Sequence, residues 1–85
     1  MKHLLLLRHA KSSWENPQCS DFDRPITPRG KQVIPLMGRI LNSMEPSLEK
    51  VFSSTAKRAI ETSRGVIQEI SRPPVLEEYP SLYLA

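Results

Sequence analysis

Cysteine is nearly absent from this sequence, because Cys19 is the only one in 85 residues. A single cysteine excludes the internal disulfide framework that stabilises many small secreted domains, so nothing points to an oxidising compartment. The apolar run from Leu4 to Leu7 is too short for a membrane span or for the hydrophobic part of a signal peptide. We therefore expect one small globular unit that is cytoplasmic.

Blocks of like charge and aromatic residues are also scarce. The chain has a net charge of +3, its twelve basic residues are scattered, and only five residues are aromatic. Nucleic-acid binding would need basic residues gathered on one face with aromatic residues between them. Neither nucleic acid nor a membrane is therefore an expected partner.

Three short apolar segments have the length of strands. The segment 2–8 is continuously apolar, as in a strand covered on both faces of a parallel sheet, and the segments 49–53 and 75–79 follow later. Two longer segments with helical spacing separate them. This alternation predicts an α/β fold with a largely parallel sheet.

The first helix has a clear start signal. Thr27 followed by Pro28 is typical of an N-cap and the first helical position, and the helix should run to about Met44. Pro35 interrupts its interior, where a proline costs about 3 kcal/mol. The second helix should run from Ser54 or Thr55 to about Ile70. The residues predicted to face the core are Val33, Met37, Ile40, Leu41 and Met44 in the first helix, and Ala59, Ser63, Val66, Ile67 and Ile70 in the second.

Polar residues follow the first two predicted strands. Arg8 and His9 stand at the end of the first strand, and Ser53, Ser54 and Arg58 stand just beyond the second. Ligands of parallel α/β sheets bind at the carboxyl ends of the strands, and a helix start with guanidinium groups favours an anion. These residues predict a phosphoryl site, in which a neutral His9 imidazole could attack phosphorus and carry the group covalently.

Three motifs make the chain resemble a known family. "LLLLRHAKS" at 4–12, "DFDRPITPRG" at 21–30 and "SSTAKRAIETS" at 53–63 are similar to segments of the histidine phosphatase superfamily, in the family's order and spacing. Ala10 after the histidine resembles the branch of SixA-type phosphohistidine phosphatases. The resemblance implies a three-layer α/β/α fold like that of the phosphoglycerate mutases.

The resemblance also implies the roles of individual residues. His9 matches the catalytic nucleophile, Arg8 the phosphate ligand beside it, and Arg58 the second phosphate arginine. Arg24 matches a further basic contact at the rim of the pocket, and Ser53 matches a position that lines it. No metal and no organic cofactor is implied. The implied partner is a phosphorylated histidine-containing phosphotransfer protein, with a small phosphorylated metabolite as the alternative.

The sequence also departs from the family pattern. Family members carry a second catalytic histidine in a later Gly-His-Asn segment, which these residues lack, so residues 1–85 resemble one partial domain, the first half of the fold. Glu77 and Glu78 are candidates for the general acid by position only. A phosphohistidine substrate needs an acid least, because its leaving imidazole has a pKa of about 6.5.

Two functional hypotheses follow from this departure. One is a phosphohistidine phosphatase that acts through His9, and the other is a truncated half-domain that binds phosphate or a protein without catalysis. An exposed sheet edge and a half-formed core would also favour self-association of the isolated fragment.

Overall fold

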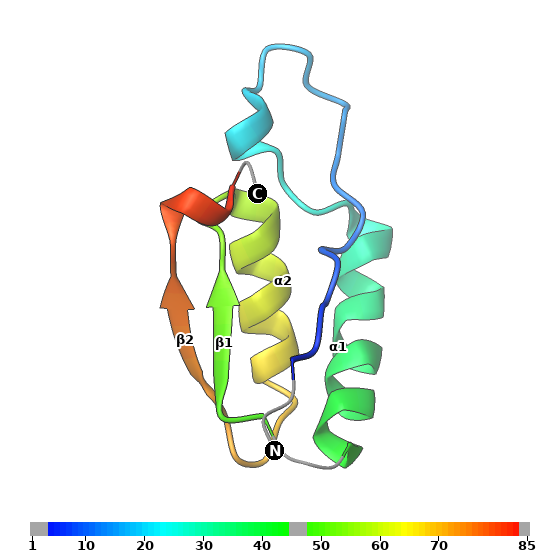
Figure 1. The fold of residues 1–85 in the computed structure, drawn as a ribbon. Coiled ribbons are helices and arrows are strands. Elements are labelled where there is room, and N and C mark those ends of the chain that lie inside the picture. The colour runs from blue at the N-terminus through cyan, green and yellow to red at the C-terminus, as the bar shows by residue number, and fades with distance from the viewer. Residues whose placement is uncertain (1–3, 45–47, 84–85) are drawn as a thin grey trace.

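The chain folds as a short parallel sheet with two helices (Figure 1). The computed structural model describes residues 4–44 and 48–83. Its elements are, in order, η1 (Asp21–Asp23), α1 (Pro28–Ser43), β1 (Lys50–Ser53), α2 (Lys57–Ile67), β2 (Val75–Glu78) and η2 (Pro80–Leu82). The two strands are parallel neighbours, with Lys50 beside Val75 and Ser53 beside Glu78. The predicted α/β fold and the strands near 49–53 and 75–79 are confirmed.

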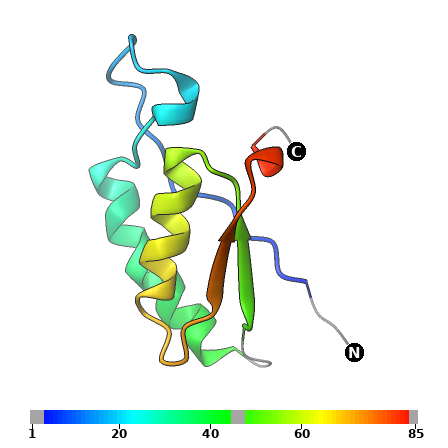
Figure 2. The ribbon, with the colours of Figure 1, turned by 90° about the vertical axis from the view of Figure 1, so that its left-hand side faces the viewer.

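Both helices lie on the same side of the sheet (Figure 2). α2 packs against β1, and α1 packs against α2 rather than against the strands. Four buried apolar residues form a small core around the contact between the helices: Ile26, Ile34, Leu41 and Val66. Among the described residues, no helix combines the length and apolar composition that crossing a membrane requires.

The predicted start of α1 is confirmed. Thr27 is the N-cap, its hydroxyl accepts a hydrogen bond from the Gly30 amide at 2.9 Å, and Pro28 opens the helix. The helix continues through Pro35 and ends at Ser43. α2 is shorter than predicted, since it begins at Lys57 and ends at Ile67.

The predicted core face of α1 is partly wrong. Leu41 is buried, but Val33, Ile40 and Met44 are exposed. The buried residues of the helix are Gly30, Ile34, Gly38 and Leu41. The two helices approach so closely that a Cβ at Gly38 would lie 2.7 Å from the Val66 carbonyl oxygen, and a Cβ at Gly65 would collide with Ile34. The prediction considered only large apolar residues, so it missed a helix contact that depends on glycine. In α2, Val66 is buried as predicted, together with Thr62.

The first predicted strand is not formed. Residues 1–3 lie outside the described part of the chain, and residues 4–8 form no strand (dark blue in Figure 1). Leu4 and Leu6 are 83% and 86% exposed. A strand needs a paired neighbour and, for leucines on both of its faces, a layer on each side. Here both helices cover the same side of the sheet, so these leucines have no second layer to pack against.

Replacing Gly38 by alanine tests the contact between the helices. The added methyl group would lie 2.7 Å from both the Val66 carbonyl oxygen and the Glu69 Cβ. Relieving this overlap requires a shift of the backbone, which costs more free energy than a shift of a flexible side chain. We expect Gly38→Ala to lower the free energy of unfolding by about 1–3 kcal/mol in urea denaturation. Gln32→Ala, on the exposed side of α1, should change it by less than about 0.5 kcal/mol. Equal stability of the two variants would contradict the close approach.

Candidate functional site

The predicted nucleophile, His9, lies beside α2. Its ring is half-buried, and its Nδ1 donates a hydrogen bond to the Ala10 carbonyl oxygen at 2.7 Å. A carbonyl oxygen only accepts hydrogen bonds, so in the neutral ring Nδ1 carries the proton and Nε2 keeps its lone pair. In this tautomer, Nε2 is the ring nitrogen that the predicted attack on phosphorus would use.

Thr62 connects the segment that carries His9 to α2. The Ala10 amide donates to Thr62 Oγ1 at 3.0 Å, and the Thr62 hydroxyl donates to the Arg58 carbonyl oxygen at 2.8 Å. The buried hydroxyl thus joins the residue after His9 to the helical turn that begins with Lys57 and Arg58. Thr62 lies one helical turn after Arg58 in the sequence, a spacing at which a threonine hydroxyl can donate to the carbonyl oxygen of the preceding turn. The sequence gives no signal for its second bond, to the Ala10 amide.

Arg58 is held by a loop residue distant in sequence. Its side chain is 15% exposed, its Nη1 donates to the Asp21 carbonyl oxygen at 2.6 Å, and its Nη2 donates to Asp21 Oδ2 at 3.1 Å. The guanidinium carbon also lies 5.7 Å from the centre of the Tyr83 ring. Arg58 therefore sits in the first turn of α2 as predicted, with one end of its guanidinium group occupied.

Arg24 is buried, with an acceptor for each of its side-chain nitrogens. Nε donates to the Ser13 carbonyl oxygen at 3.0 Å, Nη1 to Asp21 Oδ1 at 3.1 Å, and Nη2 to Ser12 Oγ at 2.6 Å. The residue is only 8% exposed, and the ring of Trp14 covers its guanidinium carbon at 3.1 Å from the ring centre. Arg24 thus lies inside the loop that precedes α1.

Asp21 lies between the two arginines. Its Oδ1 accepts from Arg24, and its Oδ2 accepts from Arg58 and from the Tyr83 hydroxyl. These contacts, first the Tyr83 hydroxyl and then Arg24 and Arg58, lower the pKa of Asp21 to about 2. The carboxylate is therefore ionised at neutral pH, and it neutralises part of the charge of the arginine pair.

The remaining predicted site residues lie on different elements. Ser53 is buried at the end of β1, where its hydroxyl donates to the Ser54 carbonyl oxygen at 2.8 Å. Arg8 is exposed and lines a small cavity of about 60 Å³ together with Ala10 and Thr62. Within residues 4–44 and 48–83, no hydrogen bond or ion pair joins Arg8 or His9 to Arg58. The structure therefore joins Arg24 to Arg58 through Asp21, and His9 to α2 through Thr62.

Both candidate general acids, Glu77 and Glu78, form ion pairs with basic side chains. Glu77 accepts a hydrogen bond from the Tyr79 hydroxyl at 2.7 Å and pairs with Lys50, and these contacts lower the pKa of Glu77. Glu78 pairs with Arg64 at 3.5 Å. A general acid benefits from a pKa raised toward neutrality, so these contacts oppose that role for Glu77.

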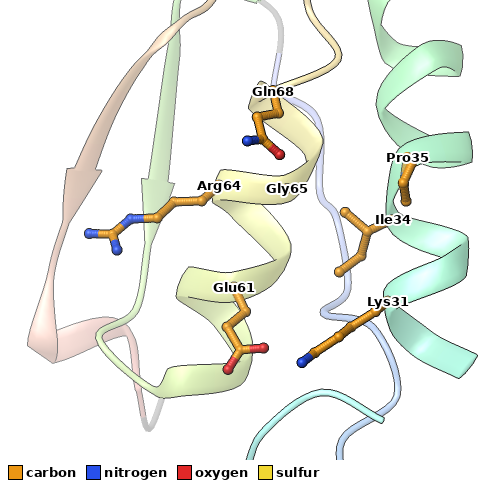
Figure 3. Close-up of a pocket in the computed structure, with 7 residues that line it drawn as sticks. All are labelled: Lys31, Ile34, Pro35, Glu61, Arg64, Gly65 and Gln68. Carbon is orange, nitrogen blue, oxygen red and sulfur yellow. The ribbon is translucent and has the colours of Figure 1, made fainter. Parts of the chain in front are cut away.

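A larger groove lies between α1 and α2 (Figure 3). It has a volume of about 480 Å³ and is lined by Lys31, Ile34, Pro35, Glu61, Arg64, Gly65 and Gln68. Ile34 points from α1 toward α2, whereas Arg64 points toward the strands (Figure 3). The groove contains no residue predicted to act in phosphoryl chemistry. The described residues also contain no group of three or more histidine, cysteine or acidic side chains that could hold a metal ion.

The family of the chain is shown by comparison with known proteins. The family model described as histidine phosphatase superfamily (branch 1) matches residues 4–79. The chain therefore belongs to the histidine phosphatase superfamily, as the three motifs predicted.

Solved structures show the same fold. A structure from Agrobacterium tumefaciens assigned to the SixA phosphohistidine phosphatases is 25% identical, with a TM-score of 0.82 over 93% of this chain and 51% of that one. The protein histidine phosphatase SixA complexed with tungstate is 29% identical, with a TM-score of 0.76 over 89% of this chain and 47% of that one. The predicted SixA-like, phosphoglycerate mutase-like fold is confirmed for this part of such a domain.

Curated relatives are similar over most of this chain. A 2,3-bisphosphoglycerate-dependent phosphoglycerate mutase from Treponema pallidum is 35% identical over 71 residues, which are 81% of this chain and 28% of the relative. An uncharacterised chloroplastic protein of Arabidopsis thaliana is 33% identical over 69 residues, or 81% of this chain and 32% of the relative. The chain thus spans about a third of these relatives' length.

The titration of Asp21 tests the arginine cluster. We expect its carboxyl group to titrate at about 2 in an NMR pH titration, below the ordinary value of about 3.9. Because the folded pKa is lower than the unfolded one, this group's contribution to stability is complete above about pH 4 and is lost as the pH falls toward 2. Tyr83→Phe removes the largest cause and should raise the pKa of Asp21. The same pKa in both proteins, near 4, would contradict the cluster.

Replacing Thr62 tests the link between His9 and α2. Thr62→Val keeps the side-chain shape but leaves the Ala10 amide without its acceptor, so the free energy of unfolding should fall by about 1–3 kcal/mol. Hydrogen exchange at the Ala10 amide should become faster. Thr62→Ser keeps the hydroxyl and should retain the protection of that amide. Unchanged exchange in Thr62→Val would show that the bond is not made in solution.

Proposed function

We propose that the protein transfers a phosphoryl group from a phosphorylated protein histidine to His9 and then to water. The proposal rests on membership of the histidine phosphatase superfamily and on the similarity to SixA structures. The observation that carries it is the hydrogen bond from His9 Nδ1 to the Ala10 carbonyl oxygen, which in the neutral ring leaves the lone pair on Nε2. We infer that residues 1–85 correspond to the N-terminal half of a histidine phosphatase domain, since they cover 51% of the Agrobacterium structure.

The chemistry balances without a metal or an organic cofactor. His9 Nε2 forms a bond to phosphorus while the bond between phosphorus and the substrate's imidazole breaks, and that imidazole takes up a proton. Water then attacks the phosphoryl group, the bond to Nε2 breaks, and inorganic phosphate and a proton are released. Arg58 and Arg8 would bind the phosphoryl oxygens and stabilise their charge during both transfers. In this proposal, Arg24 and Ser53 support the rim and the floor of the pocket.

A phosphohistidine is the substrate class that the described residues favour. Its leaving imidazole has a pKa of about 6.5 and departs without a strong acid. An alkoxide leaving group would need one, and the carboxylates of Glu77 and Glu78 are instead paired with Lys50 and Arg64. We therefore propose a phosphorylated histidine-containing phosphotransfer protein as the partner. The single cysteine, Cys19, fits a reducing cytoplasm, where we place the reaction.

Two observations favour alternative functions. The similarity to a Treponema pallidum phosphoglycerate mutase favours a small phosphorylated metabolite as substrate. The exposed leucines of residues 4–7 favour a half-domain that binds a protein, or a second copy of itself, without catalysis.

Phosphorylation of His9 tests the proposed function. The folded chain is incubated with a protein phosphohistidine donor or with a small phosphorylated metabolite, quenched at high pH to preserve phosphoramidates, and examined by intact-mass analysis. We expect an acid-labile phosphoryl group on the parent chain with the protein donor, and none on His9→Ala. His3→Ala removes the only other histidine and should keep the adduct.

Each other outcome of this experiment points to a different conclusion. An adduct formed only with the metabolite would favour the small substrate. An adduct retained on His9→Ala would reject the nucleophile. A folded parent chain that forms no adduct would favour the binding half-domain.

A further inference from the structure

Asp21 binds both terminal nitrogens of Arg58. The Asp21 carbonyl oxygen accepts from Nη1 at 2.6 Å, and its carboxylate Oδ2 accepts from Nη2 at 3.1 Å. One residue thus holds the outer end of the guanidinium group through a backbone and a side-chain atom. Such a two-point contact restricts both the position and the rotation of the group.

Arg24 forms a hydrogen bond with the other carboxylate oxygen of Asp21. Arg24 donates to Asp21 Oδ1 at 3.1 Å, while its other two nitrogens donate to Ser12 and Ser13. The loop around Arg24 is tied by bonds from the Ser13 amide to the Pro25 carbonyl oxygen and from the Thr27 amide to the Lys11 carbonyl oxygen, each 2.8 Å. Arg24 is therefore a fixed support against which Asp21 is placed.

The contact with Asp21 leaves part of Arg58 available. A guanidinium group has five N–H donors, and Asp21 uses one on each terminal nitrogen. Nε–H and a second N–H on each terminal nitrogen remain along the sides of the group. Phosphoryl oxygens could therefore bind to a side edge while Asp21 keeps the outer end.

We propose that Asp21 is a positioning residue of the phosphate site, which holds Arg58 ready for phosphoryl oxygens and is itself oriented by Arg24. The proposal rests on the proposed function, since it assumes that Arg58 binds phosphate. A long arginine side chain normally loses rotamer freedom when it binds an anion. An arginine that is already held in place loses less, so phosphate binds more tightly. Arg24 then acts on the site through Asp21.

The charge of Asp21 makes the predicted change in phosphate affinity distinctive. Asp21 is a negative charge close to a site for an anion, so its charge alone weakens phosphate binding. If Asp21 only masked Arg58, removing its charge would tighten binding. If Asp21 positions Arg58, the same substitution weakens binding although a repulsive charge has been removed.

The test compares Asp21→Asn with Asp23→Asn. Asp23 lies on the same short helix, and its carboxylate bonds to the Ser20 hydroxyl rather than to an arginine, so both variants lose one negative charge in the same region. We measure the dissociation constant of inorganic phosphate by calorimetry on the full chain. Asp21→Asn should raise it by about tenfold, the size of effect typical of groups that orient a ligand-binding side chain. Asp23→Asn should leave it unchanged or slightly lower. A lower dissociation constant in Asp21→Asn would overturn the proposal.

The role of Arg24 is tested by a double-mutant cycle. If Arg24 acts through Asp21, adding Arg24→Lys to Asp21→Asn should not weaken phosphate binding further. Fully additive losses would mean that Arg24 reaches the site independently. The amide spectrum of each variant reports whether the loop that holds Arg24 remains folded.

A second readout separates this proposal from the proposed function. NMR relaxation of the Arg58 Nε–Hε group reports the order of its side chain without any ligand. We expect this group to be ordered in the parent chain and in Asp23→Asn, and mobile in Asp21→Asn. If the parent chain binds no phosphate, the proposed function fails. The relaxation of Arg58 then decides whether Asp21 positions this side chain. Loss of order in Asp21→Asn supports the positioning role, and retained order rejects it.

Discussion

The arrangement of the site depends on the hydroxyl of Thr62. The leucine segment before His9 has no strand partner among the described residues, so the sheet does not position it. The bond from the Ala10 amide to Thr62 Oγ1 ties it instead to α2, and the bond from the same hydroxyl to the Arg58 carbonyl oxygen ends at the residue expected to bind phosphate. A single buried hydroxyl thus relates the predicted nucleophile to the predicted phosphate ligand.

The arginine cluster brings two guanidinium groups together in a chain with a net charge of only +3. Two guanidinium groups brought together would repel each other, and Asp21 between them offsets that repulsion through one carboxylate. The Tyr83 hydroxyl adds a neutral donor to the same oxygen that Arg58 uses. The lowered pKa of Asp21 follows from these donors, and it keeps the carboxylate charged throughout the physiological range.

The sequence predicted the elements that local signals define. Thr27 and Pro28 marked the start of α1 because capping is a local interaction, and the three motifs identified the family. The buried face of α1 was missed because its contact with α2 uses Gly38, which hydrophobic spacing ignores. Asp21 was not among the predicted site residues, because its bond to Arg58 spans 37 residues and depends on the tertiary fold. Residues 4–8 form no strand for a related reason, since a strand depends on a paired neighbour and on cover from other elements, which local sequence does not specify.

These contacts divide the site into two parts with different structural support. Arg24, Asp21 and Arg58 are joined by hydrogen bonds of 2.6–3.1 Å between the loop before α1 and the first turn of α2. His9 follows an exposed leucine segment, and among the described residues the hydrogen bond that joins this segment to α2 comes from its neighbour, Ala10. Arg58, one of the two expected phosphate ligands, therefore lies on an element that is already packed, whereas Arg8, the other one, lies on the exposed leucine segment. Transfer of a phosphoryl group to His9 also needs the leucine segment to be ordered, because attack on phosphorus requires the imidazole within about 3–3.5 Å and in line. Leu4 and Leu6 are exposed, so the described packing does not supply that order, and the placement of His9 depends more on the leucine segment than the placement of Arg58 does.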